Sequence, residues 1–183
     1  MYPKELQSVI LAAARAAVSD RICGTSELDT LELKRYQDLH ETRGVFVTLK
    51  HGESLRGCIG IIIGSDPLYE AIPRIAVESA VEDPRFYPLR CPELSGITFE
   101  VSILTPLKDI DSYEQIVLGR DGILLTCRGR RSVFLPQVAV EQNWGLEETL
   151  NHLALKAGLP EAAWREGSCS FAVFQAEVFR EGK

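Results

Sequence analysis

The sequence predicts an α+β fold with a mainly antiparallel sheet flanked by helices. Segments with strand and helix periodicity mix along the chain without the regular strand–helix–strand alternation of a parallel sheet. Two pairs of predicted strands are also joined by short turns containing glycine, which is typical of hairpins. The 183 residues fit one large domain or two small lobes sharing a core, so we expect a single domain over 1–183.

The individual elements follow from hydrophobic periodicity and turn signals. Helices are expected over Glu5–Ile22, from Asp66-Pro67 to Asp83-Pro84 with a kink at Pro73, over Pro136–Gln142, and over Leu146–Ala157. Strands are expected over Val45–Leu49, Leu55–Ile63, Ile97–Leu104, Gly122–Thr126, Ser132–Leu135 and Phe171–Phe179. Segment 26–42 is expected to be a surface connection with at most a short helix. In the clearest strand, Ile97–Leu104, the apolar side chains face one way, and Thr98, Glu100 and Ser102 face the other.

Composition and charge exclude several classes of protein. The net charge of -6 and the lack of a long basic stripe argue against nucleic-acid binding. The N-terminus lacks a signal-peptide pattern, and no apolar run approaches the ~20 residues that a membrane span needs. We therefore expect a cytoplasmic protein that does not enter a membrane.

The cysteines and histidines suggest no structural metal site and no cofactor. The five cysteines are widely spaced and include no Cys-x-x-Cys, so we expect neither a disulfide framework nor a zinc finger. This cysteine usage suits a reducing cytosol. None of the three histidines has another His or Cys at metal-ligand spacing, which also disfavours a Cys–His dyad.

The segment Leu55-Arg56-Gly57-Cys58-Ile59-Gly60 is the first candidate site. Alternation along a strand predicts Arg56 and Cys58 on one face and Leu55 and Ile59 on the other, with Gly57 and Gly60 clearing space beside them. A guanidinium near a thiol favours the thiolate, and an Arg beside glycine-exposed backbone can hold a carboxylate or phosphate. The alternative is structural, since a lone Cys in a strand is usually a small core residue.

Two further sets of residues are candidates. In Asp83-Pro84-Arg85-Phe86, Asp83 is a candidate general acid or base and Arg85 an anion clamp, unless the turn only ends a helix with a surface ion pair. Glu100 and Ser102 share a strand face. Glu100 is a candidate proton carrier, and Ser102 a binding residue, if that face lines the same cleft as Arg56, and both are ordinary polar positions if it faces solvent.

Several segments together resemble the AMMECR family, whose prokaryotic members are called AmmeMemoRadiSam system protein A. The resemblance covers about Gly44 to Phe179 and rests on the following segments: Gly44-Val45-Phe46-Val47-Thr48-Leu49, Leu55-Arg56-Gly57-Cys58-Ile59-Gly60, Asp83-Pro84-Arg85-Phe86, Glu100-Val101-Ser102-Ile103-Leu104, Leu135-Pro136-Gln137-Val138-Ala139 and Lys156-Ala157-Gly158-Leu159-Pro160. It implies a larger and a smaller lobe, with a cleft between them that carries the Arg-Gly-Cys segment. It also implies two partners, a MEMO-like protein similar to extradiol dioxygenases and a radical S-adenosylmethionine enzyme.

Two functions of different classes remain open. In the first, the protein is a binding or adaptor module that holds a small anionic ligand and acts with these partners. In the second, it is an enzyme in which Cys58 is a nucleophile or thiol acid/base, Arg56 an anion anchor, and Asp83 or Glu100 the proton carrier. The lack of spaced histidines and metal ligands favours the binding role.

Overall fold

Two four-stranded antiparallel sheets organise the chain, and the computed structural model describes residues 1–182. The chain divides into two compact units, and each is described by itself. Unit 1 comprises 1–104 and the C-terminal segment from Glu177 onward, and unit 2 comprises Thr105–Ala176. Among residues 1–182, no helix is both long and apolar enough to cross a membrane.

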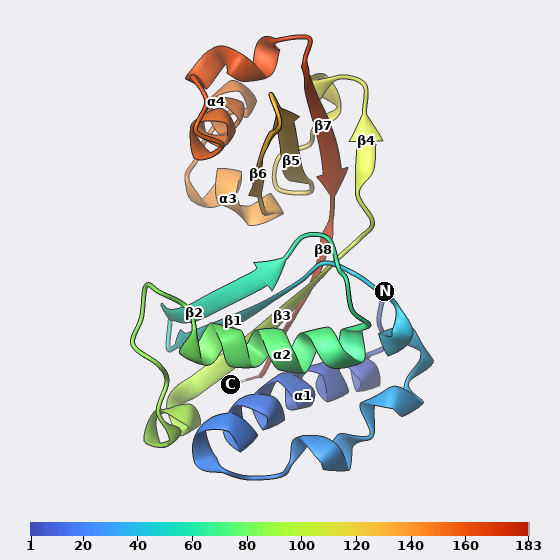
Figure 1. The fold of residues 1–183 in the computed structure, drawn as a ribbon, viewed down its shortest axis with the longest axis vertical. Coiled ribbons are helices and arrows are strands. Elements are labelled where there is room, and N and C mark those ends of the chain that lie inside the picture. Colours follow the sequence, from blue (N-terminus) through green and yellow to red (C-terminus); the bar gives the residue numbers. More distant parts are fainter. Residues whose placement is uncertain (183) are drawn as a thin grey trace. The chain divides into compact units, whose positions relative to one another are not determined.

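Unit 1 is built from a sheet with strand order β2-β1-β3-β8 and two long helices. Its elements are α1 (Lys4–Cys23), β1 (Val45–His51), β2 (Ser54–Ile61), α2 (Leu68–Val81), β3 (Ile97–Leu104) and β8 (Ala176–Arg180). The segment between α1 and β1 contains three short 3-10 helices, within Leu28–His40, and another spans Cys91–Gly96. Figure 1 shows α1 and α2 side by side on one face of this sheet.

The core of unit 1 lies between that sheet face and the two helices. Alternate residues of β1, namely Val45, Val47 and Leu49, are fully buried there, as the strand alternation predicts. In β3 the predicted apolar residues are also buried, whereas Thr98 and Glu100 on the opposite face are only partly covered. The face of the sheet away from α1 and α2 therefore carries the polar residues.

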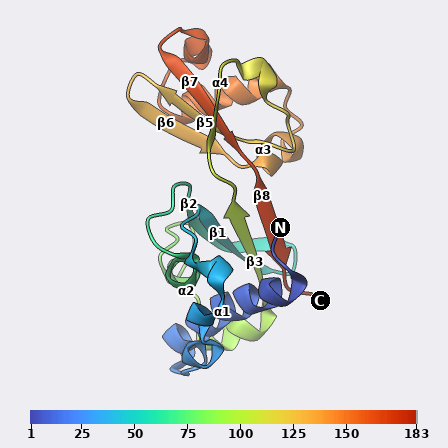
Figure 2. The same ribbon diagram turned by 90° about the vertical axis from the view of Figure 1, so that its right-hand side faces the viewer.

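Unit 2 has its own sheet, with strand order β4-β7-β5-β6, and its own core. Its elements are β4 (Lys108–Ile110), β5 (Gly122–Cys127), β6 (Arg130–Phe134), α3 (Pro136–Glu141), α4 (Leu146–Lys156), a 3-10 helix (Glu161–Arg165) and β7 (Cys169–Phe174). The core includes Leu125, Leu153, Trp164 and Phe171, which come from the sheet, α4 and the 3-10 helix. Figure 2 shows α4 beside the strands of this sheet.

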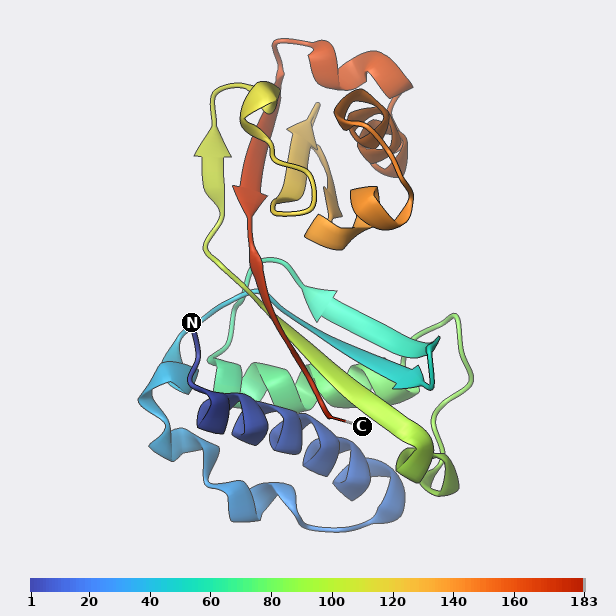
Figure 3. The same cartoon turned by 180° about the vertical axis from the view of Figure 1, so that it is seen from behind.

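One predicted strand differs from the structure, and one strand of the structure was not predicted. The single strand expected over Phe171–Phe179 is two strands, because β7 pairs in the sheet of unit 2 and β8 pairs with β3 in unit 1 (Figure 3). The three-residue strand β4 was not predicted, since it is too short to show a period. The helix after Asp66 begins at Leu68 and runs through Pro73 to Val81.

The expectation that the cysteines form no disulfide framework is wrong. Disulfides join Cys23 to Cys91 and Cys127 to Cys169, and Cys58 is the free cysteine. The sequence separations are 68 and 42, so the pairing depends on tertiary contacts that spacing along the chain does not reveal.

Candidate functional site

A β-bulge places Arg56 differently from the predicted alternation. Thr48 pairs with Cys58 and Leu49 with Gly57, but Lys50 pairs with Leu55, so Arg56 is the extra residue of the bulge. Leu55 therefore lies on the same sheet face as Cys58, and the prediction that the two face opposite ways is wrong. A bulge redirects the side chain of the inserted residue, and Arg56 reaches Glu93.

Cys58 is half-buried, and its backbone and side chain are both held by polar partners. The Thr48 hydroxyl donates to Cys58 Sγ at 3.3 Å from the neighbouring strand. The Cys58 N–H donates to Asp83 Oδ2 at 2.8 Å, and the Cys58 carbonyl accepts from Arg85 Nη2 at 3.1 Å. The guanidinium that contacts Cys58 is thus that of Arg85.

Asp83 is buried and ionised. Besides the Cys58 N–H, it accepts from the Arg85 backbone N–H at 3.1 Å, from Arg85 Nε at 2.9 Å and from Arg85 Nη2 at 2.7 Å. The hydrogen bonds from the Arg85 side chain, followed by those from the backbone N–H groups of Cys58 and Arg85, hold the pKa of Asp83 well below its usual range. Asp83 is therefore better suited to act as a fixed negative charge that positions Arg85 than to exchange protons near neutral pH.

The Asp83–Arg85 turn also covers the edge of the sheet at Cys58. Strand β2 lies at the edge, where backbone donors and acceptors lack a strand partner. Asp83 accepts from the Cys58 N–H and Arg85 donates to the Cys58 carbonyl, so the two side chains supply what a neighbouring strand would. The Arg-Gly-Cys segment and the Asp83–Arg85 turn therefore form one hydrogen-bonded cluster.

The space beside Gly57 and Gly60 is filled by other parts of the protein. A Cβ on Gly57 would lie 2.1 Å from the Ser79 carbonyl oxygen, and a Cβ on Gly60 would lie 2.2 Å from the Phe46 ring. The Ser79 hydroxyl, from α2, accepts from the Ile59 N–H and donates to the Val47 carbonyl, both at 2.9 Å. The expected open space beside the thiol is thus occupied, and the two glycines as ligand-binding residues stay a prediction.

A groove of about 730 Å³ lies next to this hydrogen-bonded cluster, and its wall is rich in arginine. It is lined by Arg56, Arg85, Phe86, Tyr87, Pro88, Arg90, Pro92 and Glu93. Cys58 is not among the lining residues, so Arg85 is the link between the thiol and the groove.

The arginines of the groove differ in how they are held. Glu93 accepts from Arg56 Nε at 3.2 Å and from the Arg90 backbone N–H at 2.9 Å. Both bonds lower the pKa of Glu93, and the bond from the Arg90 backbone has the larger effect. Arg85 is fixed by Asp83 while its side chain remains 54% exposed. The charge of Arg90 also contributes to the lowered pKa of Glu93, but no salt bridge fixes the Arg90 guanidinium within residues 1–182. The groove therefore offers fixed and free guanidinium donors to an anion.

Glu100 and Ser102 lie on the polar face of the sheet but away from the groove. Thr48 pairs with Cys58 on one side and with Glu100 on the other, so Cys58 and Glu100 are two strand spacings apart, roughly 10 Å. Glu100 pairs with Arg180 at 2.8 Å and with Lys50 at 3.6 Å. Ser102 is buried. The structure thus brings together Cys58, Asp83 and Arg85, and separates them from Glu100 and Ser102.

Sequence reasoning missed Thr48, Ser79, Arg90 and Glu93. A signal was present for Glu93, which follows Cys91-Pro92 at the third position of the 3-10 helix and accepts from the Arg90 backbone N–H, as the glutamate of a capping box does. Arg90 has no such signal. Thr48 and Ser79 have no comparable signal, since their roles depend on the register of β1 and β2 and on the packing of α2.

Fold and groove together define an α+β protein with two antiparallel sheets and an arginine-lined groove in unit 1. A family model described as AMMECR1 matches residues 11–179. Protein MK0488 of Methanopyrus kandleri is 46% identical over 154 residues, which cover 79% of this chain and 74% of that protein. Protein MJ0810 of Methanocaldococcus jannaschii is 39% identical over 177 residues, which cover 92% and 86%.

A solved structure has the same fold. The crystal structure of the uncharacterized protein PH0010 from Pyrococcus horikoshii matches with a TM-score of 0.88 and 35% identity, covering 98% of this chain and 93% of that one. The chain belongs to the AMMECR1 family, and the predicted α+β fold class is confirmed. The cleft expected between a larger and a smaller lobe stays a prediction.

Proposed function

We propose that unit 1 is a binding module that holds a small anionic ligand in the groove lined by Arg56, Arg85 and Arg90. The observation that carries this proposal is the arrangement of the guanidinium groups on one wall, with Asp83 and Glu93 orienting two of them. Arginine forks recognise carboxylates and phosphates, and orienting them in advance lowers the entropic cost of binding. The exposed Tyr87 ring at the groove supplies a flat apolar surface for a planar part of the ligand.

Charge supports the same choice. The whole chain carries a net charge of -6, so this cluster of arginines is a local reversal of sign. A positive groove on an acidic protein attracts small anions while the rest of the surface repels large ones.

Calorimetric titration with pyrophosphate and with citrate tests the proposal. Arg90→Ala removes the guanidinium that no salt bridge fixes, and we expect about 10-fold weaker binding, in line with the loss of one charged hydrogen bond. Arg131→Ala, an exposed arginine in β6, is the matched control and should bind like the unaltered protein. Binding that is absent, or that both variants weaken equally, would overturn the proposal.

We further propose that this module acts with a MEMO-like protein and a radical S-adenosylmethionine enzyme. Membership of the AMMECR1 family supports this, through the resemblance described above. Affinity purification of the tagged chain from its own cells, with and without Arg90→Ala, checks whether these partners are recovered and whether the groove is needed. Recovery of neither enzyme class would contradict the proposal.

The alternative function is an enzyme that uses the Cys58 thiol. It is favoured by the hydrogen bond from the Thr48 hydroxyl to the sulfur and by the position of the Arg85 guanidinium, which donates to the Cys58 carbonyl. Iodoacetamide labelling of the folded protein across pH tests it. A thiol that stays unlabelled until the protein unfolds would exclude a covalent role.

A further inference from the structure

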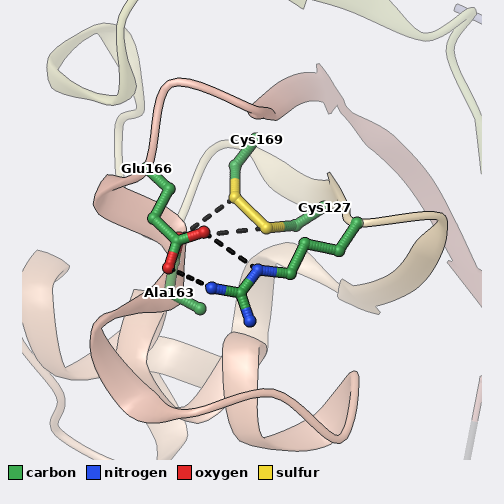
Figure 4. Close-up of a disulfide and its surroundings, with 5 residues drawn as sticks. Cys127, Ala163, Glu166 and Cys169 are labelled. Atoms are coloured by element: carbon green, nitrogen blue, oxygen red, sulfur yellow. Dashed lines mark hydrogen bonds and ion pairs between the residues drawn. A yellow bond between two sulfur atoms is a disulfide. The ribbon is translucent and has the colours of Figure 1, made fainter.

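In unit 2, two cysteines and a glutamate converge where β5 ends and β7 begins. Cys127 is the last residue of β5, Cys169 is the first of β7, and the two are directly paired. The Glu166 carboxylate lies just after the 3-10 helix, and its oxygen and both sulfurs lie within 4.8 Å of one another (Figure 4). We propose that, when Cys127 and Cys169 are reduced, these three side chains bind one Zn²⁺ ion.

The donor set suits this ion. Zinc is bound in proteins by cysteine thiolates and carboxylates, and it favours four ligands in a tetrahedron. The carbonyl oxygen of Ala163 is 3.0 Å from Cys169 Sγ and 3.8 Å from Cys127 Sγ, so it faces the space between the sulfurs and supplies the fourth donor.

The charges balance as well. Two thiolates and the carboxylate carry three negative charges, and the Arg128 guanidinium, which donates to both oxygens of Glu166, carries one positive charge. A divalent cation makes the set neutral. Proteins usually orient a ligating carboxylate through a hydrogen bond from a residue outside the ligand set, and Arg128 would orient Glu166 in this way.

Burial indicates a closed structural site. Cys127 is fully buried and Cys169 half-buried, whereas Glu166 is exposed and marks the side from which an ion enters. Four protein donors leave no position for a substrate, which is typical of structural zinc. The ion would join the ends of β5 and β7 to the 3-10 helix and so stabilise unit 2.

The structure has the two sulfurs joined as a disulfide, and this form and the metal form exclude each other. A dithiol or phosphine reductant supplies two electrons and breaks the S–S bond, which gives two thiols. Zn²⁺ then displaces one proton from each thiol as the two Zn–S bonds form. The site is thus available to metal only under reducing conditions.

The test uses the full chain, reduced with a phosphine, stripped of metal and titrated with Zn²⁺ or with Co²⁺ as a spectroscopic probe. We expect one Zn²⁺ per chain after gel filtration and a thiolate-to-Co²⁺ charge-transfer band. The Cys23→Ser/Cys91→Ser variant, which removes the other cysteine pair, is the matched control and should keep both signals. The Cys127→Ser/Cys169→Ser variant should lose both.

Glu166→Gln keeps both thiols, and we expect about 10-fold weaker Zn²⁺ binding or more, with an altered Co²⁺ spectrum. The Glu166→Gln variant tests the proposed Zn²⁺ site even if the double cysteine variant fails to fold. Reduced protein that retains no Zn²⁺ would overturn the proposal, as would Zn²⁺ binding that is lost with Cys23 and Cys91, or binding that Glu166→Gln leaves unchanged.

Discussion

Gly57 of the edge strand β2 packs directly against the backbone of α2 at Ser79, so a single methyl group tests how tightly this site is packed. In Gly57→Ala the new Cβ would lie 2.1 Å from the Ser79 carbonyl oxygen, which is backbone and cannot swing away. We expect a loss of about 3 kcal/mol in the free energy of unfolding of unit 1, typical of an overpacked core. Urea unfolding followed by far-UV circular dichroism measures it. Gly167→Ala, where a Cβ meets nothing within 4 Å, should be near neutral.

Asp83 predicts a specific dependence of stability on pH. Because Arg85 lowers the pKa of this carboxyl in the folded state, its contribution is present in full above the unfolded-state pKa of about 3.9 and is lost as pH falls toward the lower folded-state value. We expect Asp83→Asn to cost about 2 kcal/mol at pH 7 and to flatten the loss of stability below about pH 4. Unfolding curves between pH 7 and pH 2 measure this.

The comparison for that series is Asp111→Asn, at an exposed position in unit 2. The stability of Asp111→Asn should depend on pH in the same way as that of the unaltered protein. If Asp83→Asn and the unaltered protein lose stability in parallel on acidification, the carboxylate of Asp83 does not supply the acid-sensitive contribution.

For single residues, the alternation of side chains along a strand predicted some positions correctly and others wrongly. It correctly separated Glu100 from Phe99 in β3, because that strand pairs with β1 without a break in register. It failed at Arg56, because the pairing with β1 defines the bulge. Gly57 within the strand is the kind of residue that marks a bulge, but it does not tell which neighbour is the inserted residue. The contact between Asp83 and Cys58 spans 25 residues, and it could be predicted only as a shared family motif.

Among the elements, the 3-10 helix Cys91–Gly96 forms part of the groove wall and is tethered by a disulfide to the last residue of α1. Pro92 and Glu93 follow the tethered Cys91 directly. Closing a loop of this length contributes about 4 kcal/mol in the chain-entropy view. We therefore expect Cys23→Ser/Cys91→Ser to lower the stability of unit 1 and to weaken pyrophosphate binding, since Glu93 would orient Arg56 less well.

Calorimetric titration and thermal unfolding of this variant measure both effects. Cys127→Ser/Cys169→Ser removes the disulfide of unit 2 and should leave pyrophosphate binding unchanged. Equal binding by both variants and the unaltered protein would show that the groove wall does not depend on its tether.

The strands near the C-terminus show what periodicity leaves open. Phe171 to Phe179 is rich in strand-forming residues throughout, so the sequence pattern predicts one strand. The break falls at Gln175, whose backbone N–H and carbonyl are both bonded to Thr105, at 2.8 Å each. This partner is 70 residues away, so only the tertiary structure divides the segment between two sheets.

For the whole molecule, the two separate cores imply that unit 2 folds by itself. Thr105–Ala176 is one continuous segment with a complete sheet, a core of its own and the Cys127–Cys169 disulfide. Unit 1 is discontinuous, because it needs β8, whose Phe179 is buried in its core. Small domains often require a disulfide in addition to a core, and this segment has both.

The chain offers a selective probe for this prediction. Both of its tryptophans, Trp144 and Trp164, lie in unit 2, and Trp164 is buried in the core beside Tyr113. We expect the isolated segment 105–176 to show the same tryptophan fluorescence transition in urea as the full chain, with the disulfide intact in both. A midpoint that falls sharply in the fragment, or a fragment spectrum typical of exposed tryptophan, would mean that this core depends on residues outside 105–176. A shared midpoint would make the transition of unit 2 a measurement independent of every substitution in the groove.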